Sequence, residues 1–175
     1  MVDISRFKPK TVYVTYIAAT PEKVWQALTD PAFTQQYFGG FRADAEPKAG
    51  GHFRLLYPDG RVHISGEVLE WSPPCRFTCT WLVEGIKEFG ELPVCIVSYD
   101  IVPAGDAVKL TMTESHSWDV PAAILAGGQS GWPAILSGLK SLLETGKAPK
   151  IEMKPPEGFM EAVQKAVAEK PWLKG

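Results

Sequence analysis

The sequence predicts an α+β fold, in which an antiparallel β-sheet is covered on one face by a long C-terminal helix. Residues 41–116 form short segments of alternating apolar and polar residues, separated by turn residues, and this pattern indicates consecutive strands. Residues 131–145 instead repeat their apolar residues at helical spacing. Because the strands and the helices lie in separate parts of the chain, the order is typical of the α+β class.

The first strand and two short helices are expected before the run of strands. Residues 10–19 are rich in β-branched and aromatic side chains, which favour a strand. Thr20-Pro21 combines an N-cap residue with a proline at the first helical position, so a helix begins there. Asp30-Pro31 repeats this signal and predicts a second short helix.

The middle of the chain is expected to be a meander of strands. Pro58-Asp59-Gly60 and Ala104-Gly105-Asp106 are typical of tight turns. The predicted strands are residues 42–45, 51–57, 62–71, 75–83, 92–102 and 108–116, with a loop over residues 84–91. One face of the 75–83 strand is apolar and carries Cys75, Phe77, Cys79, Trp81 and Val83.

The helix predicted over residues 131–145 carries one apolar stripe. Ser130 is its expected N-cap, Pro133 is tolerated in the first turn, and Gly146 is a fitting C-cap. Residues 118–128 are expected to be a loop or a broken turn that begins at Asp119-Val120-Pro121. The stripe consists of Trp132, Ile135, Leu136, Leu139, Leu142 and Leu143. The small residues on the other face either let another element approach closely or lie in solvent; they are Ala134, Ser137, Gly138 and Ser141.

The tail differs in composition from the rest of the chain. It is rich in proline through Pro156, and then Phe159, Met160, Val163 and Val167 recur at helical spacing. An isolated helix this short is unstable in water, so we expect it to dock on other residues. We therefore assign residues 1–148 to one domain and residues 149–175 to a C-terminal extension.

Composition excludes several classes of partner. The net charge is −2, with 18 basic and 20 acidic residues and no basic run, which argues against nucleic acid. No apolar run approaches the ~20 residues of a membrane span, and the N-terminus has no apolar signal segment. We expect a cytoplasmic protein that binds neither nucleic acid nor membrane.

The cysteines and histidines do not suggest a metal or a cofactor. Cys75 and Cys79 lie ~13 Å apart along one predicted strand, too far for a disulfide, and with Cys95 they are expected to be small buried apolar residues. The three histidines are scattered along the sequence, with His63 expected on an exposed face. We therefore expect no metal site and no cofactor.

Three groups of residues resemble one known superfamily. The segment VTYIAATPEKVWQALTDP, residues 14–31, is similar to the opening of START-like proteins, also called the helix-grip or SRPBCC superfamily. The second group resembles the central hairpin of these proteins and consists of Gly66-Glu67-Val68, followed by Pro73-Pro74, Phe77 and Thr80-Trp81. Gly131-Trp132 with Ser141-Leu142-Leu143 resembles the closing helix of one branch, the homologues of the activator of heat-shock protein 90 ATPase.

The resemblance implies a helix-grip fold, with a curved antiparallel sheet wrapped around the long C-terminal helix and two short helices after the first strand. Such folds enclose a cavity that holds small apolar or aromatic molecules. We therefore expect non-catalytic binding of such a molecule between the sheet and the helix. The expected ligand-binding residues are Trp81, Tyr99, Met112, Glu114, His116, Trp132 and Leu136.

Two other functions stay open. The resemblance suggests an accessory protein of chaperones or stress responses that acts through protein contacts, and a homodimer is plausible for this fold. Alternatively, Glu114 and His116, two residues apart on the inward face of the last strand, are candidate catalytic residues of a cyclase- or hydrolase-like enzyme. Non-catalytic binding remains the leading hypothesis.

Overall fold

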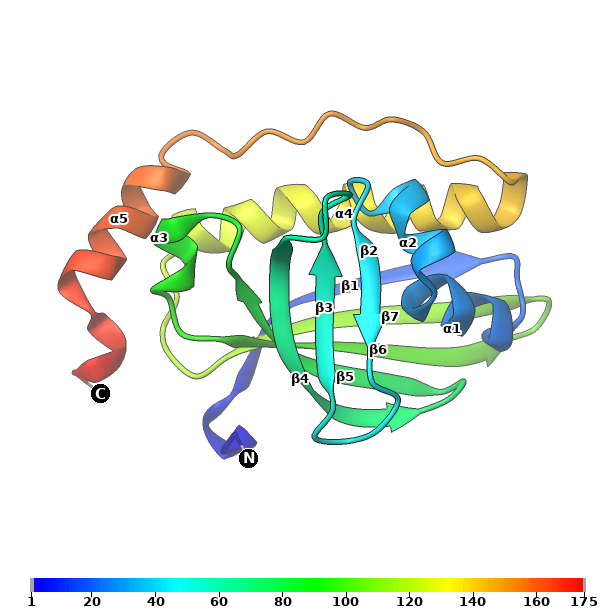
Figure 1. The fold of residues 1–175 in the computed structure, drawn as a ribbon, viewed down its shortest axis with the longest axis horizontal. Coiled ribbons are helices and arrows are strands. Elements are labelled where there is room, and N and C mark those ends of the chain that lie inside the picture. Colours follow the sequence, from blue (N-terminus) through cyan, green and yellow to red (C-terminus); the bar gives the residue numbers. More distant parts are fainter. Residues whose placement is uncertain (1, 175) are drawn as a thin grey trace.

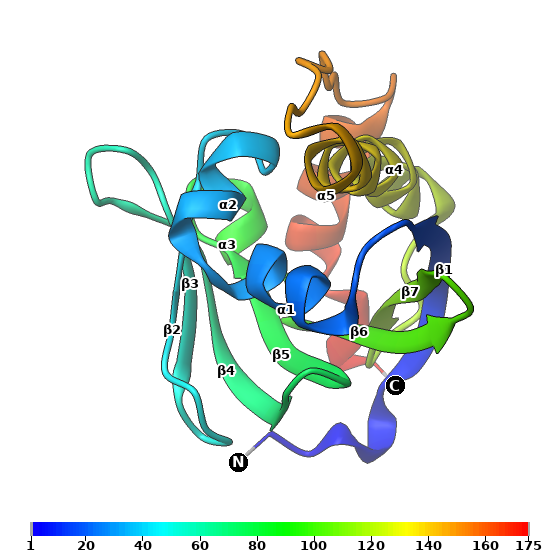
Figure 2. The ribbon, with the colours of Figure 1, turned by 90° about the vertical axis from the view of Figure 1, so that its right-hand side faces the viewer.

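Seven antiparallel strands form one curved sheet that wraps around a long helix, α4 (Ala122–Thr145) (Figures 1 and 2). The computed structural model describes residues 2–174. Across the sheet, the strands are β1 (Lys8–Ile17), β7 (Ala107–His116), β6 (Cys95–Ala104), β5 (Arg76–Val83), β4 (Val62–Ser72), β3 (His52–Leu56) and β2 (Arg42–Ala45). This architecture confirms the predicted α+β, helix-grip fold class.

Two short helices, α1 (Pro21–Thr29) and α2 (Pro31–Tyr37), follow the first strand, as predicted. Thr20 caps the first helix, because its Oγ1 accepts a hydrogen bond from the backbone N–H three residues further on, at 3.3 Å. Asp30 caps the second helix, and its Oδ1 accepts from the N–H two residues further on, at 2.8 Å. The local signals in the sequence therefore fix both helix starts.

The concave face of the sheet faces α4 (Figure 2), and the main core of buried side chains lies between them. Leu139 from the apolar stripe is fully buried, together with Val97 and Leu110 from the strands. Gly138 shows why small residues lie beside the stripe: a Cβ there would come within 3.3 Å of Tyr37 Cβ. One of the predicted small residues therefore lets α2 pack closely against α4.

Helix α4 begins at Ala122, earlier than the sequence predicts, and Ser130 lies inside the helix rather than at its N-cap. The predicted loop over residues 118–128 is therefore wrong from Ala122 onward, including Gly127 and Gly128. Both glycines are helical, and neighbouring side chains pack closely against them: a Cβ on Gly127 would lie 2.3 Å from Phe159 Cε2. Tertiary packing here outweighs the low helix propensity of glycine.

Two smaller expectations about the middle of the chain are wrong. The predicted loop over residues 84–91 contains a short helix, α3 (Lys87–Gly90). Cys75 is exposed in the turn between β4 and β5, because the strand begins only at the next residue. The other two cysteines are buried, as expected, and all three are free thiols.

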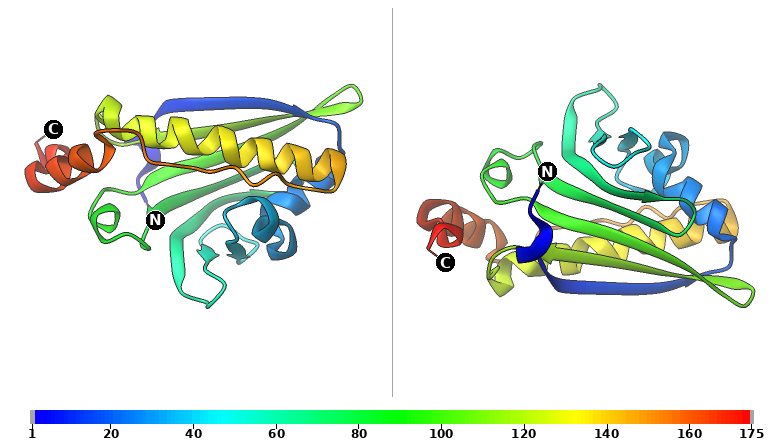
Figure 3. Two further views of the ribbon diagram at one scale, coloured as in Figure 1. Left: turned by 90° about the horizontal axis from the view of Figure 1, so that it is seen from above. Right: turned by 90° about the horizontal axis from the view of Figure 1, so that it is seen from below.

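The tail folds back over the domain. Residues 147–157 run along α4 toward its beginning, and α5 (Phe159–Glu169) docks there against α3 and α4 (Figures 1 and 3). Trp172, in the 3₁₀ turn η2 (Pro171–Leu173), meets the buried Trp118 with ring centroids 5.2 Å apart. The chain begins with a similar turn, η1 (Ile4–Arg6). Within residues 2–174, no helix has both the length and the apolar character that crossing a membrane requires.

Candidate functional site

A cavity of about 520 Å³ lies between the sheet and the first half of α4. The ends of β5, β6 and β7 and the helix α4 form its main walls, while α3 and the folded-back tail close its sides. Most of its lining is apolar, and its large side chains include Phe38, Trp81, Ile86, Phe89, Trp132 and Phe159. The volume lies within the range of roughly 300–1,000 Å³ that is typical of small-molecule sites.

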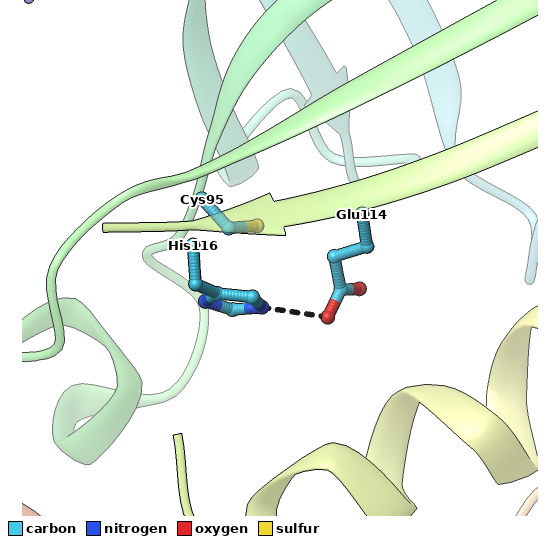
Figure 4. A group of neighbouring side chains, drawn as sticks. All are labelled: Cys95, Glu114 and His116. Carbon is cyan, nitrogen blue, oxygen red and sulfur yellow. Dashed lines mark hydrogen bonds and ion pairs between the residues drawn. The ribbon is translucent and has the colours of Figure 1, made fainter. Parts of the chain in front are cut away.

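Three polar side chains gather at one end of this cavity (Figure 4). Glu114 and His116 share one face of β7, because strand residues two apart point to the same side. The antiparallel register pairs Ile96 with Ser115 and so places Cys95 beside His116. One ligating atom from each of the three side chains lies within 4.8 Å of those of the other two.

Hydrogen bonds fix the carboxylate of Glu114. The indole Nε1 of Trp132 donates to Oε2 at 2.8 Å, and the imidazole Nε2 of His116 lies 2.8 Å from Oε1. The side chains of Glu114 and His116 are 13% and 12% exposed, respectively. A shielded carboxylate–imidazole pair of this kind can orient a polar group of a ligand or exchange a proton with it.

Burial controls the state of two further side chains that line the cavity. It raises the pKa of the Cys95 thiol well above its ordinary value, and the nearby charge of Glu114 adds to the effect. Cys95 is therefore a neutral thiol near pH 7 rather than a thiolate nucleophile. Burial lowers the pKa of His63, whose ring stacks on Phe41 at 4.2 Å and whose Nδ1 lies 3.0 Å from Tyr57 Oη.

The structure divides the predicted ligand-binding residues into two groups. Trp81, Glu114, His116 and Trp132 line the cavity, and the rings of the two tryptophans lie 5.4 Å apart. The other three do not line it: Tyr99, Met112 and Leu136 are buried in the core. Ligand contact by any of the seven remains a prediction.

Sequence reasoning missed several residues of the cavity wall. His63 was expected to face solvent, but it is half-buried and lines the cavity. Cys95 could have been found, because counting equally outward from the turn at Gly105-Asp106 places it opposite His116. Phe159 could not, since nothing local to the tail indicates where its helix docks.

Comparisons with known proteins agree with this fold and cavity. Residues 18–144 match the family described as Activator of Hsp90 ATPase homolog 1-like protein. No curated protein matches the chain.

Three solved structures illustrate the similarity. The first is DynU16, a protein of the dynemicin biosynthetic locus, with 25% identity over 86% of this chain and a TM-score of 0.68; this chain covers 51% of DynU16, about half its length. The second is PFC0360w, an HSP90 activator from Plasmodium falciparum, with 21% identity, coverage of 70% of this chain and 86% of that one, and a TM-score of 0.56. The third is the Aha1 dimer from Colwellia psychrerythraea, with 18% identity, coverage of 78% of this chain and 97% of that chain, and a TM-score of 0.59.

The family match spans most of the chain and includes every strand from β2 to β7 as well as both walls of the cavity. The structural neighbours share the curved sheet and the gripped helix. The chain therefore belongs to the family of Activator of Hsp90 ATPase homolog 1-like proteins, within the START-like superfamily.

Proposed function

We propose that the protein binds one small apolar or aromatic molecule, without transforming it, in the cavity between the sheet and α4. The observation that carries this proposal is the volume of about 520 Å³ behind largely apolar walls. Burial of apolar surface contributes about 25 cal/mol per Å² before the costs of ordering. Trp81 and Trp132 supply aromatic surface, and the Glu114–His116 pair supplies the polar end.

The test fills the cavity without removing any wall. Gly131 lines the cavity, and a Cβ at this position would meet no atom within 4 Å. A Gly131→Leu substitution therefore places an apolar side chain in the open space and also favours the helix. Ser137→Leu is the matched control, because residue 137 is an exposed position of the same helix.

Native mass spectrometry of gently purified protein gives the readout. We expect an excess mass that disappears under denaturing conditions, present in the natural protein and in S137L but absent in G131L. An excess of equal size in G131L would place the ligand elsewhere. If the natural protein instead shows no excess mass and no change in tryptophan emission when aromatic compounds are added, the result favours the second candidate function, an accessory role through protein contacts.

That second candidate is an accessory role through protein contacts. It is supported by the description of the family and by the Plasmodium falciparum activator of similar fold. A homodimer is one form of such contact, since the similar Colwellia psychrerythraea protein is a dimer.

The outer face of β1 carries Val12, Val14 and Tyr16, each at least half exposed, and is the surface we assign to a second copy. The same native spectrum reports the oligomer, and Val14→Lys is expected to convert a dimer to monomers.

A further inference from the structure

We propose that Cys95, Glu114 and His116 form a binding site for one divalent transition-metal ion of the zinc class at the polar end of the cavity. The description of the family names no metal. The proposal does not depend on binding of an apolar ligand, because the three side chains belong to the protein itself.

The first argument is the distance between the ligand atoms. Zinc binds thiolate sulfur at about 2.3 Å and imidazole nitrogen or carboxylate oxygen at about 2.0–2.2 Å, so ligand atoms around a tetrahedral ion are roughly 3.3–3.6 Å apart. Here the sulfur, nitrogen and oxygen atoms lie within 4.8 Å of one another. Small side-chain rotations, without movement of the paired strands β6 and β7, bring them to coordination distance.

The second argument is the chemistry of the donors. A sulfur, an imidazole nitrogen and a single carboxylate suit borderline ions such as Zn²⁺ or Co²⁺. Mg²⁺ and Ca²⁺ prefer six or more oxygen ligands, and Glu114 alone cannot provide them. Three protein ligands leave one position of a tetrahedral ion for water or for a ligand in the cavity.

The third argument is the unused capacity of the site. Glu114 is a largely buried carboxylate, and among residues 2–174 it forms no ion pair with a lysine or an arginine. The Nδ1 atom of His116 is buried and has no hydrogen-bond partner within the same part of the chain. A bound cation compensates the buried negative charge of Glu114 and gives the imidazole of His116 a further partner.

The surroundings also resemble those of metal sites. Trp132 Nε1 donates to Glu114 Oε2, and Oε1 faces His116 Nε2, so the carboxylate is held in one orientation with one oxygen directed at the other two ligands. Hydrogen bonds of this kind orient ligands and raise metal affinity. When the ion binds, the Cys95 thiol releases its proton to solvent as the metal–sulfur bond forms.

The test adds Co²⁺ to the full chain after treatment with a chelator, in the presence of a phosphine reductant. We expect a near-ultraviolet charge-transfer band from thiolate to cobalt that saturates at one ion per chain and is displaced by Zn²⁺ but not by Mg²⁺. Cys95→Ser removes the band. Cys75→Ser, which changes the exposed cysteine outside the cavity, is the matched control and keeps it.

Two further variants separate ligation from folding. His116→Gln is expected to weaken Zn²⁺ binding at least tenfold in calorimetric titration, and Trp132→Phe to weaken it about tenfold through the orientation of Glu114. Circular dichroism shows whether each variant is folded. If C95S does not fold, the affinity of H116Q for Zn²⁺ tests the metal site instead. Absence of the band in the natural protein, or an unchanged band in C95S, overturns the proposal. If G131L loses the apolar ligand but keeps the cobalt band, the metal site and the proposed apolar-ligand site are independent, and each can fail without the other.

Discussion

At the residue scale, Gly66 in β4 marks the closest approach of two backbones. A Cβ at this position would lie 1.8 Å from the carbonyl oxygen of Thr80, which belongs to the neighbouring strand β5. The backbone of a paired strand cannot move away from an added Cβ, whereas the end of a flexible side chain can rotate away from it. Gly66→Ala is therefore expected to lower the free energy of unfolding by about 1–3 kcal/mol.

Urea denaturation measures this effect, and Gly131→Ala is the matched glycine control. Its new Cβ meets no atom within 4 Å, and its position is helical. We expect this variant to be more stable than the natural protein by up to about 1 kcal/mol. Equal effects of the two substitutions would contradict the steric argument.

His63 gives a prediction about pH. Because burial lowers its pKa, the folded protein binds this proton less readily than the unfolded chain does. The contribution of His63 to stability is therefore complete above the unfolded pKa of about 6.5 and is lost as the pH falls through the lower pKa of the folded state. We expect His63→Phe, which keeps the stacking on Phe41, to lose less stability than the natural protein between pH 7 and pH 5.

Urea titrations at several pH values provide the comparison. The carboxyl groups whose pKa is lowered, such as Asp59 and Glu144, titrate below this interval and are common to both proteins. Parallel curves for H63F and the natural protein would show that His63 does not contribute to the pH dependence of stability.

At the scale of elements, α4 contains a proline well inside its length. Pro133 is exposed and lacks the N–H that would bond to the carbonyl of residue 129. Interior proline costs about 3 kcal/mol relative to alanine, partly offset by about 0.4–1 kcal/mol from the stiffer unfolded chain. Pro133→Ala is expected to raise the free energy of unfolding by about 2 kcal/mol in urea denaturation. A decrease would show that the proline fixes a helix shape that the core requires.

The same helix shows what local sequence can and cannot predict. The starts of α1 and α2 were predicted correctly because Thr20 and Asp30 make hydrogen bonds to residues only two or three positions away. The start of α4 lies earlier than predicted, in a segment where Gly127 packs closely against Phe159, 32 positions along the chain. Local signals predict elements whose ends are held locally, and long-range packing decides the others.

At the scale of the whole molecule, the sheet side of the cavity follows from patterns in the sequence, whereas the wall formed by the tail does not. Glu114 and His116 were recognised as candidates from their alternation on one strand, and the paired strands then bring Cys95 to them. The tail supplies another wall through Met153, Lys154 and Phe159. Sequence periodicity gives the face of each element, whereas the path of residues 147–157 along α4 follows from tertiary packing alone.

The tail wall gives the last prediction. Phe159 is half-buried, lines the cavity and packs against Phe89 with ring centroids 5.5 Å apart. Truncation of a fully buried phenylalanine costs about 3–5 kcal/mol, and we expect roughly 1–2 kcal/mol for Phe159→Ala because this side chain is only partly buried. The same change removes wall area, so a ligand that copurifies with the natural protein is expected to be retained about tenfold less, which corresponds to 1.4 kcal/mol.

Leu173→Ala is the matched tail control, since this apolar side chain is 72% exposed and does not line the cavity. Thermal unfolding and native mass spectrometry measure stability and ligand retention on the same samples. If F159A loses stability but retains the ligand fully, the tail only supports the fold. If it loses the ligand while L173A does not, the extension forms part of the binding site, and residues 149–175 cannot be regarded as an appendage to the cavity.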